Sequence, residues 1–234
     1  MLLFAAAAVL GGYGAGYERI GGGVASEREA RALIAQLTSD LSSARFHRDG
    51  VITSSATGWP LSRLGFLSLQ PAQVQSDAGR IGDLCAVNYY IKDLSISGKC
   101  VRCLMRGFRE SQDTFAALEA DTVSSLFTER NQLDEPVALG VVAFDASPRS
   151  RGPSGQWIAW DGNDQIGPDA LAVRLVLARR DLAAKLRMPA DWDGAGTTGK
   201  LLGDPSAAAC SPSLEVYETL IHFGNHENPH LSDP

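Results

Sequence analysis

The chain has 234 residues, of which 44% are hydrophobic and 21% are charged, a composition typical of a globular domain rather than of a disordered or fibrous protein. Its length is that of one ordinary domain, or of a domain with an appended arm. The formal net charge of −6 argues against a nucleic-acid partner, because binding to phosphates requires a basic face.

The N-terminus is a bare apolar run, residues 1–10. It is too short to cross a bilayer, which takes about 20 predominantly apolar residues. Three interpretations stay open: the apolar part of a secretory signal, a buried strand that leads into a phosphate-binding loop, or one half of a membrane helix. No Lys or Arg precedes the run, which weakens the first interpretation.

Seven glycines follow between Gly11 and Gly23. Each costs a soluble helix about 1 kcal/mol relative to alanine, whereas helices in a membrane or packed against other helices tolerate glycine better. The spelling Gly12-Tyr-Gly-Ala-Gly suggests a dinucleotide loop, but the G-x-G-x-x-G spacing would place its third glycine at Tyr17. A nucleotide-binding enzyme that uses the Gly11–Gly23 loop is therefore kept as an alternative function.

Residues 24–45 form the clearest predicted helix. Ser26 and Glu29 have the spacing of a capping box, in which each side chain bonds an otherwise unpaired N–H of the first turn. Apolar residues then recur at helical spacing in one stripe, namely Ala30, Leu33, Ile34, Leu37, Leu41 and Ala44. Polar residues, Asp40 among them, are expected mostly on the other faces. Four members of the stripe are predicted to dock the helix on the rest of the protein: Leu33, Ile34, Leu37 and Leu41.

Short strands dominate the chain from residue 46 onward. Alternating apolar residues predict a hairpin of strands 84–92 and 100–106 with a turn at Ser97 and Gly98, and they assign Arg102 and Arg106 to a solvated face. Further strands are predicted at 64–69, 137–145, 156–160 and 170–179, helical or irregular structure at 111–127, a short helix at 181–187 and one ordered patch at 214–223. The hairpin spacing favours an antiparallel sheet over the parallel sheet of a nucleotide-binding enzyme.

No residue is assigned a catalytic, cofactor-binding or metal-binding role, and no enzyme activity or cofactor is expected. Cys100-Val-Arg-Cys103 has C-x-x-C spacing, but residues three apart in a strand point to opposite faces. His222 and His226 have the spacing of a metal pair on a helix, which the glycine between them disfavours. An extracytoplasmic metal-binding module stays an alternative. The sequence leaves open the redox state of the four cysteines: Cys85, Cys100, Cys103 and Cys210.

Four segments in order carry a family resemblance: the helix end at 29–44, Gly82-Asp-Leu-Cys-Ala-Val-Asn-Tyr-Tyr90, its partner strand at 100–106, and Gln156-Trp-Ile-Ala-Trp160 followed by 167–177. They resemble the type IV pilin-like proteins, and most closely the J-type minor pseudopilins of type II secretion. The strings at 83–89 and 168–183 are similar to those of the pilin-like Verru_Chthon cassette protein C group of Verrucomicrobia. The resemblance covers about residues 1–186.

The resemblance implies an α+β, pilin-like fold in which an N-terminal amphipathic and hydrophobic helix packs on an antiparallel β-sheet head. We expect three parts: the helix with its apolar stub and glycine-rich joint at 1–45, a β-rich head at 46–188, and a loop-rich C-terminal tail at 189–234. Prepilins also carry a basic leader that ends in Gly, then Phe, and a Glu at the fifth position of the helix. No residue of this sequence is assigned to that pattern.

In function, the resemblance implies a non-enzymatic minor pilin-like subunit of an envelope-associated filament or of a secretion or assembly apparatus. Its partners would be other pilin-like subunits, bound through the N-terminal helix, and the membrane, bound through the apolar run if that run belongs to a longer apolar helix. The expected location is the cell envelope, with an anchor in the inner membrane and a periplasmic head.

Overall fold

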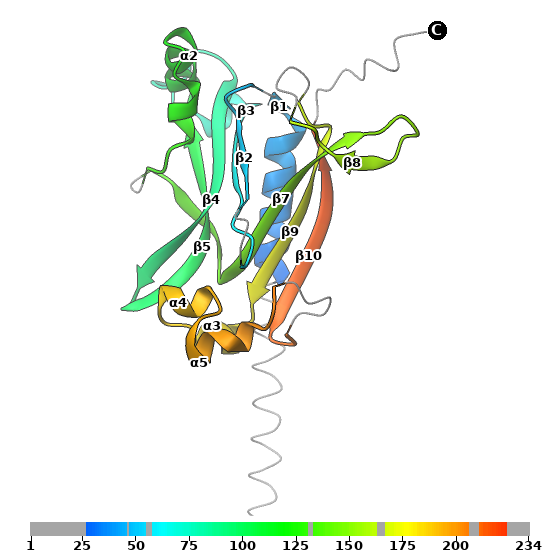
Figure 1. The fold of residues 1–234 in the computed structure, drawn as a ribbon. Helices are drawn as coiled ribbons and strands as arrows, with labels where there is room; N and C mark the ends of the chain where they lie inside the picture. Colours follow the sequence, from blue (N-terminus) through cyan, green and yellow to red (C-terminus); the bar gives the residue numbers. More distant parts are fainter. Residues whose placement is uncertain are drawn as a thin grey trace, which may run out of the picture.

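Two antiparallel sheets with one long helix in the angle between them make up the fold (Figure 1). The structure is a computed structural model, which describes residues 27–45, 47–54, 58–130, 133–162, 167–205 and 211–223. In these residues the fold is a mixture of helix and antiparallel sheet, as the sequence predicts. The apolar run at 1–10, the Gly11–Gly23 segment and Ser26 lie outside the described residues.

Sheet A contains six strands: β1 (Ala44–Arg45), β2 (Val51–Thr53), β3 (Arg63–Leu69), β4 (Leu84–Ile96), β5 (Lys99–Arg109) and β6 (Glu135–Leu139). β1 and β2 pair with successive parts of β3, and the order continues through β4 and β5 to β6. β4 and β5 form the predicted hairpin, with both strands longer than expected. Its turn residues Ser97 and Gly98 have φ values of 51° and 76°, as a tight turn with the twist of its strands requires.

Sheet B contains β7 (Val141–Arg151), β8 (Trp157–Ala159), β9 (Ala170–Ala178) and β10 (Leu214–His222), in the order β10–β9–β7–β8. The predicted strand at 137–145 is in fact two strands in different sheets, because the chain leaves β6 and enters β7 at Gly140. The φ of Gly140 is 71°, a conformation open to glycine at little cost. Residues 60–62 also join the sheets, since their backbone bonds to Phe144 of β7 before the chain enters β3.

The predicted loop-rich tail needs correction. Within the described part of residues 189–234, β10 pairs with β9 over its whole length. Three short helices, α4 (Pro189–Trp192), α5 (Gly196–Gly199) and η3 (Lys200–Leu202), bring Trp192 and Leu202 into a buried cluster with Val176 of β9. Some of the glycines that suggested loops have positive φ and let the chain turn between these short elements. The boundary at residue 188 therefore does not separate two packing units.

The helix between the sheets includes residues 27–42, so it ends three residues earlier than predicted, and Ala44 belongs to β1. Its buried side chains share one core with residues of both sheets. From sheet A these include Leu64, Val87, Tyr89 and Leu104, and from sheet B they include Phe144, Leu171, Leu175 and Leu177.

Further helices cover parts of the remaining surfaces of the sheets (Figure 1). α2 (Ser111–Glu119) and η2 (Val123–Phe127) pack on the face of sheet A that is turned away from the long helix. There a Cβ at Gly65 would lie 2.5 Å from the Phe127 ring, so glycine lets the ring pack on β3. η1 (Ala72–Val74) lies between β3 and β4, and α3 (Arg180–Ala183) lies at the end of sheet B. Of the helices in the described residues, none is both long and apolar enough to cross a membrane.

Candidate functional site: the interface of the N-terminal helix

The apolar stripe of the N-terminal helix faces the core. Leu33, Leu37 and Leu41 are buried, and Ile34 is half-buried. Burial of each leucine side chain is worth about 1.5–3 kcal/mol, so this face supplies much of the energy that holds the helix on the sheets. The role of the four residues in docking stays a prediction.

Asp40 was expected mostly away from the core, and the structure places it inside, with 0% of its surface exposed. It lies seven residues after Leu33 and therefore on the same face of the helix. Its Oδ2 accepts hydrogen bonds from the Tyr89 hydroxyl at 2.5 Å and from Arg106 Nε at 2.8 Å. Its Oδ1 accepts from Arg106 Nη2 at 3.1 Å and from Gln70 Nε2 at 3.1 Å. The carboxylate is thus surrounded by donors from sheet A and from the residue after β3, and Gln36 of the helix itself also donates to Oδ1, at 3.3 Å.

Arg106 of β5 was assigned to a solvated face, but only 12% of its side chain is exposed. Burial by itself lowers the pKa of Arg106, but the hydrogen bond and the charge of Asp40 outweigh it, and the pKa is raised. Burial also raises the pKa of Tyr89, and the charge of Asp40 raises it further. The network therefore contains a charged guanidinium, a carboxylate and a neutral hydroxyl donor. The two hydrogen bonds from Arg106 to the two oxygens of Asp40 have the bidentate geometry of a strong ion pair.

The last turn of the helix is also bonded to β3. The Ser68 hydroxyl donates to the carbonyl of Asp40 at 2.8 Å and lies 2.9 Å from the Ser43 hydroxyl. The backbone N–H of Leu69 donates to the carbonyl of Ser43 at 3.0 Å. The last carbonyls of a helix have no partner within it, and here sheet A supplies two of them with donors.

Two other arginines of β5 bind acids from distant segments. Arg102, also expected to be solvated, is buried and reaches Asp93 on β4 at 2.8 Å and Asp193 after α4 at 2.8 Å. Arg109 binds Asp134 at 2.7 Å, and Asp134 also accepts from the Tyr90 hydroxyl at 2.8 Å. β5 is therefore joined by ion pairs to the N-terminal helix, the segment before β6 and the C-terminal helices.

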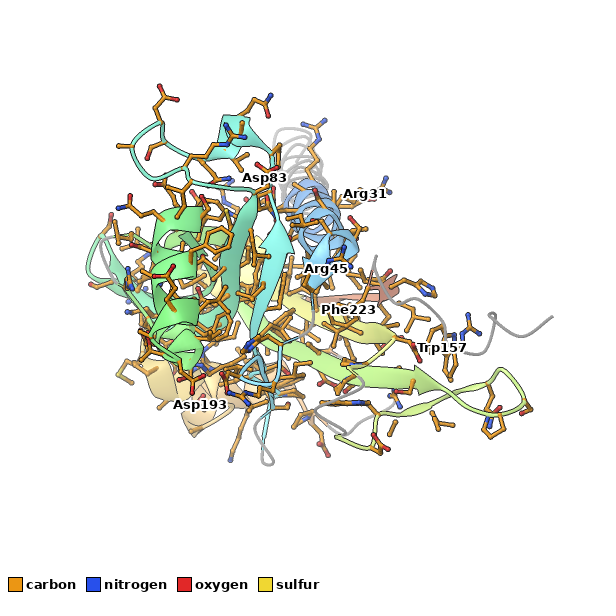
Figure 2. The ribbon with its side chains drawn as sticks, turned by 90° about the horizontal axis from the view of Figure 1, so that it is seen from above. Arg31, Arg45, Asp83, Trp157, Asp193 and Phe223 are labelled. Atoms are coloured by element: carbon orange, nitrogen blue, oxygen red, sulfur yellow. The ribbon has the colours of Figure 1, made fainter. Side chains whose placement is uncertain are left out.

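The start of the described helix lies near β10 of sheet B. The Tyr217 hydroxyl donates to Glu215 at 2.9 Å, and burial together with this bond raises the pKa of Tyr217 to about 12, with a smaller contribution from the charge of Glu27. Seen from above, Arg31 lies on the side of the helix that is turned away from the sheets (Figure 2). The described helix thus has one face on the core and one face open.

The cysteine and histidine candidates are not brought together. Cys103 is buried in a cluster with Tyr90, while Cys100 packs near Trp192 on the other face of β5. Burial raises the pKa of the Cys103 thiol to about 12. His222 is exposed on β10, and its ring lies 5.2 Å from that of Trp157. Cys210 and His226 lie outside the described residues. Among the residues that the structure describes, no group of three or more His, Cys, Asp or Glu side chains could hold a metal ion.

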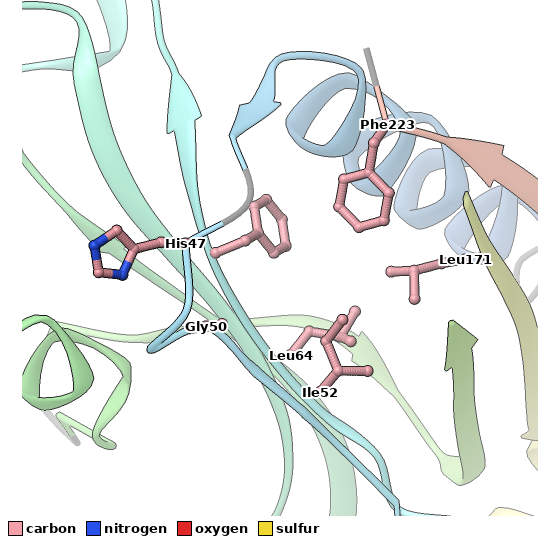
Figure 3. A pocket seen from close by; sticks show the side chains of 8 residues that line it. His47, Gly50, Ile52, Leu64, Leu171 and Phe223 are labelled. Atoms are coloured by element: carbon pink, nitrogen blue, oxygen red, sulfur yellow. The ribbon is translucent and has the colours of Figure 1, made fainter. Parts of the chain in front are cut away.

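One small apolar cavity lies between the sheets (Figure 3). Ile52 and Leu64 of sheet A and Leu171 and Phe223 of sheet B line it, and His47 lies at one side. It has room for about one water molecule, whereas pockets for small molecules have about 300–1,000 Å³. The cavity is therefore not a candidate substrate site.

No known protein-family model matches the chain, and no curated protein matches it. Among solved structures, the chain is similar to a type IV-like pilin from Thermus thermophilus. The two are 16% identical with a TM-score of 0.37, and the match covers 84% of this chain and 93% of that chain. A likeness at this level assigns neither a family nor a function.

The two alternative functions gain no support from the described residues. A nucleotide-binding enzyme would need a parallel sheet, and every strand pair in the described residues is antiparallel; an isolated bridge between Leu61 and Phe144 is parallel. A metal module would need Cys100 and Cys103 on one face. What the described residues do provide is a helix that is ion-paired and hydrogen-bonded to sheet A and packed on both sheets.

Proposed function

We propose that the protein is a non-enzymatic minor pilin-like subunit, similar to the J-type pseudopilins, of an envelope-associated filament or secretion apparatus. It binds other pilin-like subunits through its N-terminal helix. The apolar run at 1–10, as one half of a membrane helix, anchors the protein in the inner membrane, with the head in the periplasm. The observation that carries the proposal is the fixed, half-covered helix at 27–42.

The open face of this helix suits contact with a second helix. From residue 32 onward it exposes mostly small or short polar side chains, namely Ala32, Ala35, Thr38, Ser39 and Ser42, together with the longer Gln36. Small side chains let two helix backbones approach closely. The charged residues Arg28, Glu29 and Arg31 are confined to the first described turns.

The ion pair between Asp40 and Arg106 joins the helix to sheet A, which matters if the protein is held in an assembly by this helix. A subunit held in an assembly by its helix must transmit force from the helix to the head. Apolar contacts tolerate small sliding movements, whereas a bidentate pair fixes the position of one residue against another. The pair therefore keeps the head in a constant position relative to the helix.

The test is site-specific photo-crosslinking in cells that make the protein from its own gene. A photoreactive residue at Ala35 on the open helix face should capture proteins with pilin-like N-terminal sequences, identified by mass spectrometry. The matched control is Ile158, which is exposed on β8 and should not capture the same proteins.

Fractionation of the same cells tests the location. The full chain should be found in the envelope fraction, and a variant that starts at residue 24 should be released from it. The proposal is abandoned if the full chain is found in the cytoplasm, or if Ala35 and Ile158 capture the same set of proteins.

A further inference from the structure

The outer edge of β10 carries a row of backbone groups that have no strand partner among the described residues. The N–H of Phe223 donates to the carbonyl of Asp169, and the N–H of Arg179 donates to the carbonyl of Ser213. Because hydrogen-bonding direction alternates along an antiparallel strand, the odd-numbered residues of β10 bond to β9. The even-numbered residues direct their N–H and C=O groups outward, and four have no backbone partner among the described residues: Val216, Glu218, Leu220 and His222.

This edge differs from the other sheet edges in the described residues. β1, β2 and β8 have only two or three residues, and β6 has five, includes Pro136 and pairs with an irregular register. β10 has nine residues, no proline, no lysine and no register shift. Short length, proline and bulges are the usual means of blocking an edge against added strands. Figure 1 shows β10 at one edge of sheet B, beside β9.

We propose that β10 pairs with β10 of a second copy of this chain, antiparallel and about a two-fold axis, to form one continuous sheet of eight strands. The register that centres the axis on Leu220 places Glu218 of each copy opposite His222 of the other. A register centred on Glu218 would place two carboxylates opposite each other, which is unfavourable. The edge is therefore self-complementary in its backbone groups, and the register centred on Leu220 keeps the two carboxylates apart.

The side chains permit this contact. The even-numbered side chains of β10 lie on the outer face of sheet B, where Val216 is 39% exposed. The odd-numbered residues Tyr217, Ile221 and Phe223 pack on the helix side. Pairing at the edge would leave the helix in place, so this dimer is independent of assembly through the helix.

Sedimentation of the full chain in mild detergent tests the proposal. The protein should dimerise with increasing concentration. Leu220→Lys, which places two ammonium groups opposite each other, should weaken the dimer at least about tenfold, because like charges on directly opposed residues repel. The matched control is Ile158→Lys, on the exposed β8 edge, which should leave dimerisation unchanged. Circular dichroism and the melting temperature check that both variants fold.

Cysteine crosslinking tests the register. Directly opposed residues of a hydrogen-bonded pair have Cα atoms about 5.5 Å apart, within disulfide range. Leu220→Cys should therefore form an oxidised dimer, and Val216→Cys and Ile158→Cys should form no more than the wild type does.

Two further outcomes overturn the proposal. One is a chain that stays monomeric at its solubility limit, or a dimer that Leu220→Lys leaves intact. The other is slow hydrogen exchange at the Val216, Glu218 and Leu220 amides in a monomer, which would show that a segment of the same chain covers the edge. Neither outcome affects crosslinking at Ala35, so the two proposals fail separately.

Discussion

The two sheets contact the same helix but are held together by different interactions. Sheet A buries Arg102 and Arg109 and encloses most of Arg106 of the same strand, and each of the three has an acidic partner. Sheet B buries leucines on the helix side of β9, and its ion pair between Arg174 and Glu218 is 27% and 69% exposed. Sheet A therefore depends on specific charge partners, and sheet B depends on the burial of apolar surface.

The two kinds of interaction contribute differently to the specificity of packing and to the free energy of folding. A buried ion pair is often no more stabilising than apolar residues of the same volume, but loss of one partner is costly, since the other charge is left buried. Apolar contacts give energy in proportion to area and allow alternative packing. We infer that the charges of sheet A select which segments contact β5, and that sheet B supplies bulk stability.

The largest expected effect follows from removing one charge of the helix–sheet pair. Arg106→Ala leaves the Asp40 carboxylate buried without its partner, and it should lower the free energy of unfolding by about 3–5 kcal/mol. The double variant Asp40→Leu/Arg106→Met should lose much less than the sum of the losses of its single variants Asp40→Leu and Arg106→Met. Urea denaturation of the four proteins measures this coupling. Additive losses would contradict a specific pair.

A somewhat smaller effect is expected in sheet B. Leu175→Ala should cost about 2–5 kcal/mol through lost burial and the remaining cavity. Leu175→Met keeps the volume and should cost less than about 1.5 kcal/mol. The matched swap in sheet A, Asp40→Asn, also keeps the volume, yet it removes the charge that Arg106 needs. If both volume-conserving swaps cost the same in urea denaturation, the contrast between the sheets is wrong.

Patterns along the chain predict apolar faces well and buried charges poorly. The stripe through Leu33, Leu37 and Leu41 and the alternation in β4 were visible because burial has a regular period. Asp40, Arg102 and Arg106 were assigned to surfaces because a charge is normally solvated, and their partners are far apart in sequence. The sequence does contain one signal for these buried charges. Asp40 falls in phase with the apolar stripe of the helix, and Arg102 and Arg106 lie within a predicted strand.

The C-terminal segment was missed for another reason. Its glycines and short helices give no period long enough to recognise, and their order depends on contacts such as that of the Trp192 indole N–H with the carbonyl of Cys100, at 3.2 Å. The strand at 214–222 was visible only as an ordered patch, since its pairing with β9 is a tertiary contact.

An effect of intermediate size is expected on the pH dependence of the free energy of unfolding. Burial by itself raises the pKa of Asp134, but hydrogen bonds from Arg109, Arg130 and Tyr90 outweigh it, and the pKa lies below its ordinary value of 3.8. The folded state therefore keeps the charge longer than the unfolded state does, and this stability is lost as pH falls below about 4. Between pH 5 and pH 3, the free energy of unfolding measured by urea denaturation should fall less for Asp134→Asn than for the wild type. The difference is the contribution of this one carboxyl group. Equal slopes would exclude Asp134 as a source of acid sensitivity.

The smallest effect should come from the exposed pair of sheet B. Arg174 Nε lies 3.2 Å from Glu218 Oε1, a distance close to those in the buried pairs of sheet A, but water surrounds it. Exposed pairs contribute about 0.2–1 kcal/mol, and salt screens them. A double-mutant cycle of Arg174→Ala and Glu218→Ala, measured at protein concentrations low enough to keep the chain monomeric, should give a coupling in this range that vanishes in about 1 M salt. The Asp40–Arg106 coupling should persist under the same conditions, because its charges are out of contact with the solvent ions. A salt-resistant coupling at Arg174 would mean that exposure does not decide the strength of these pairs, and the distinction between the two sheets would then rest on their apolar residues alone.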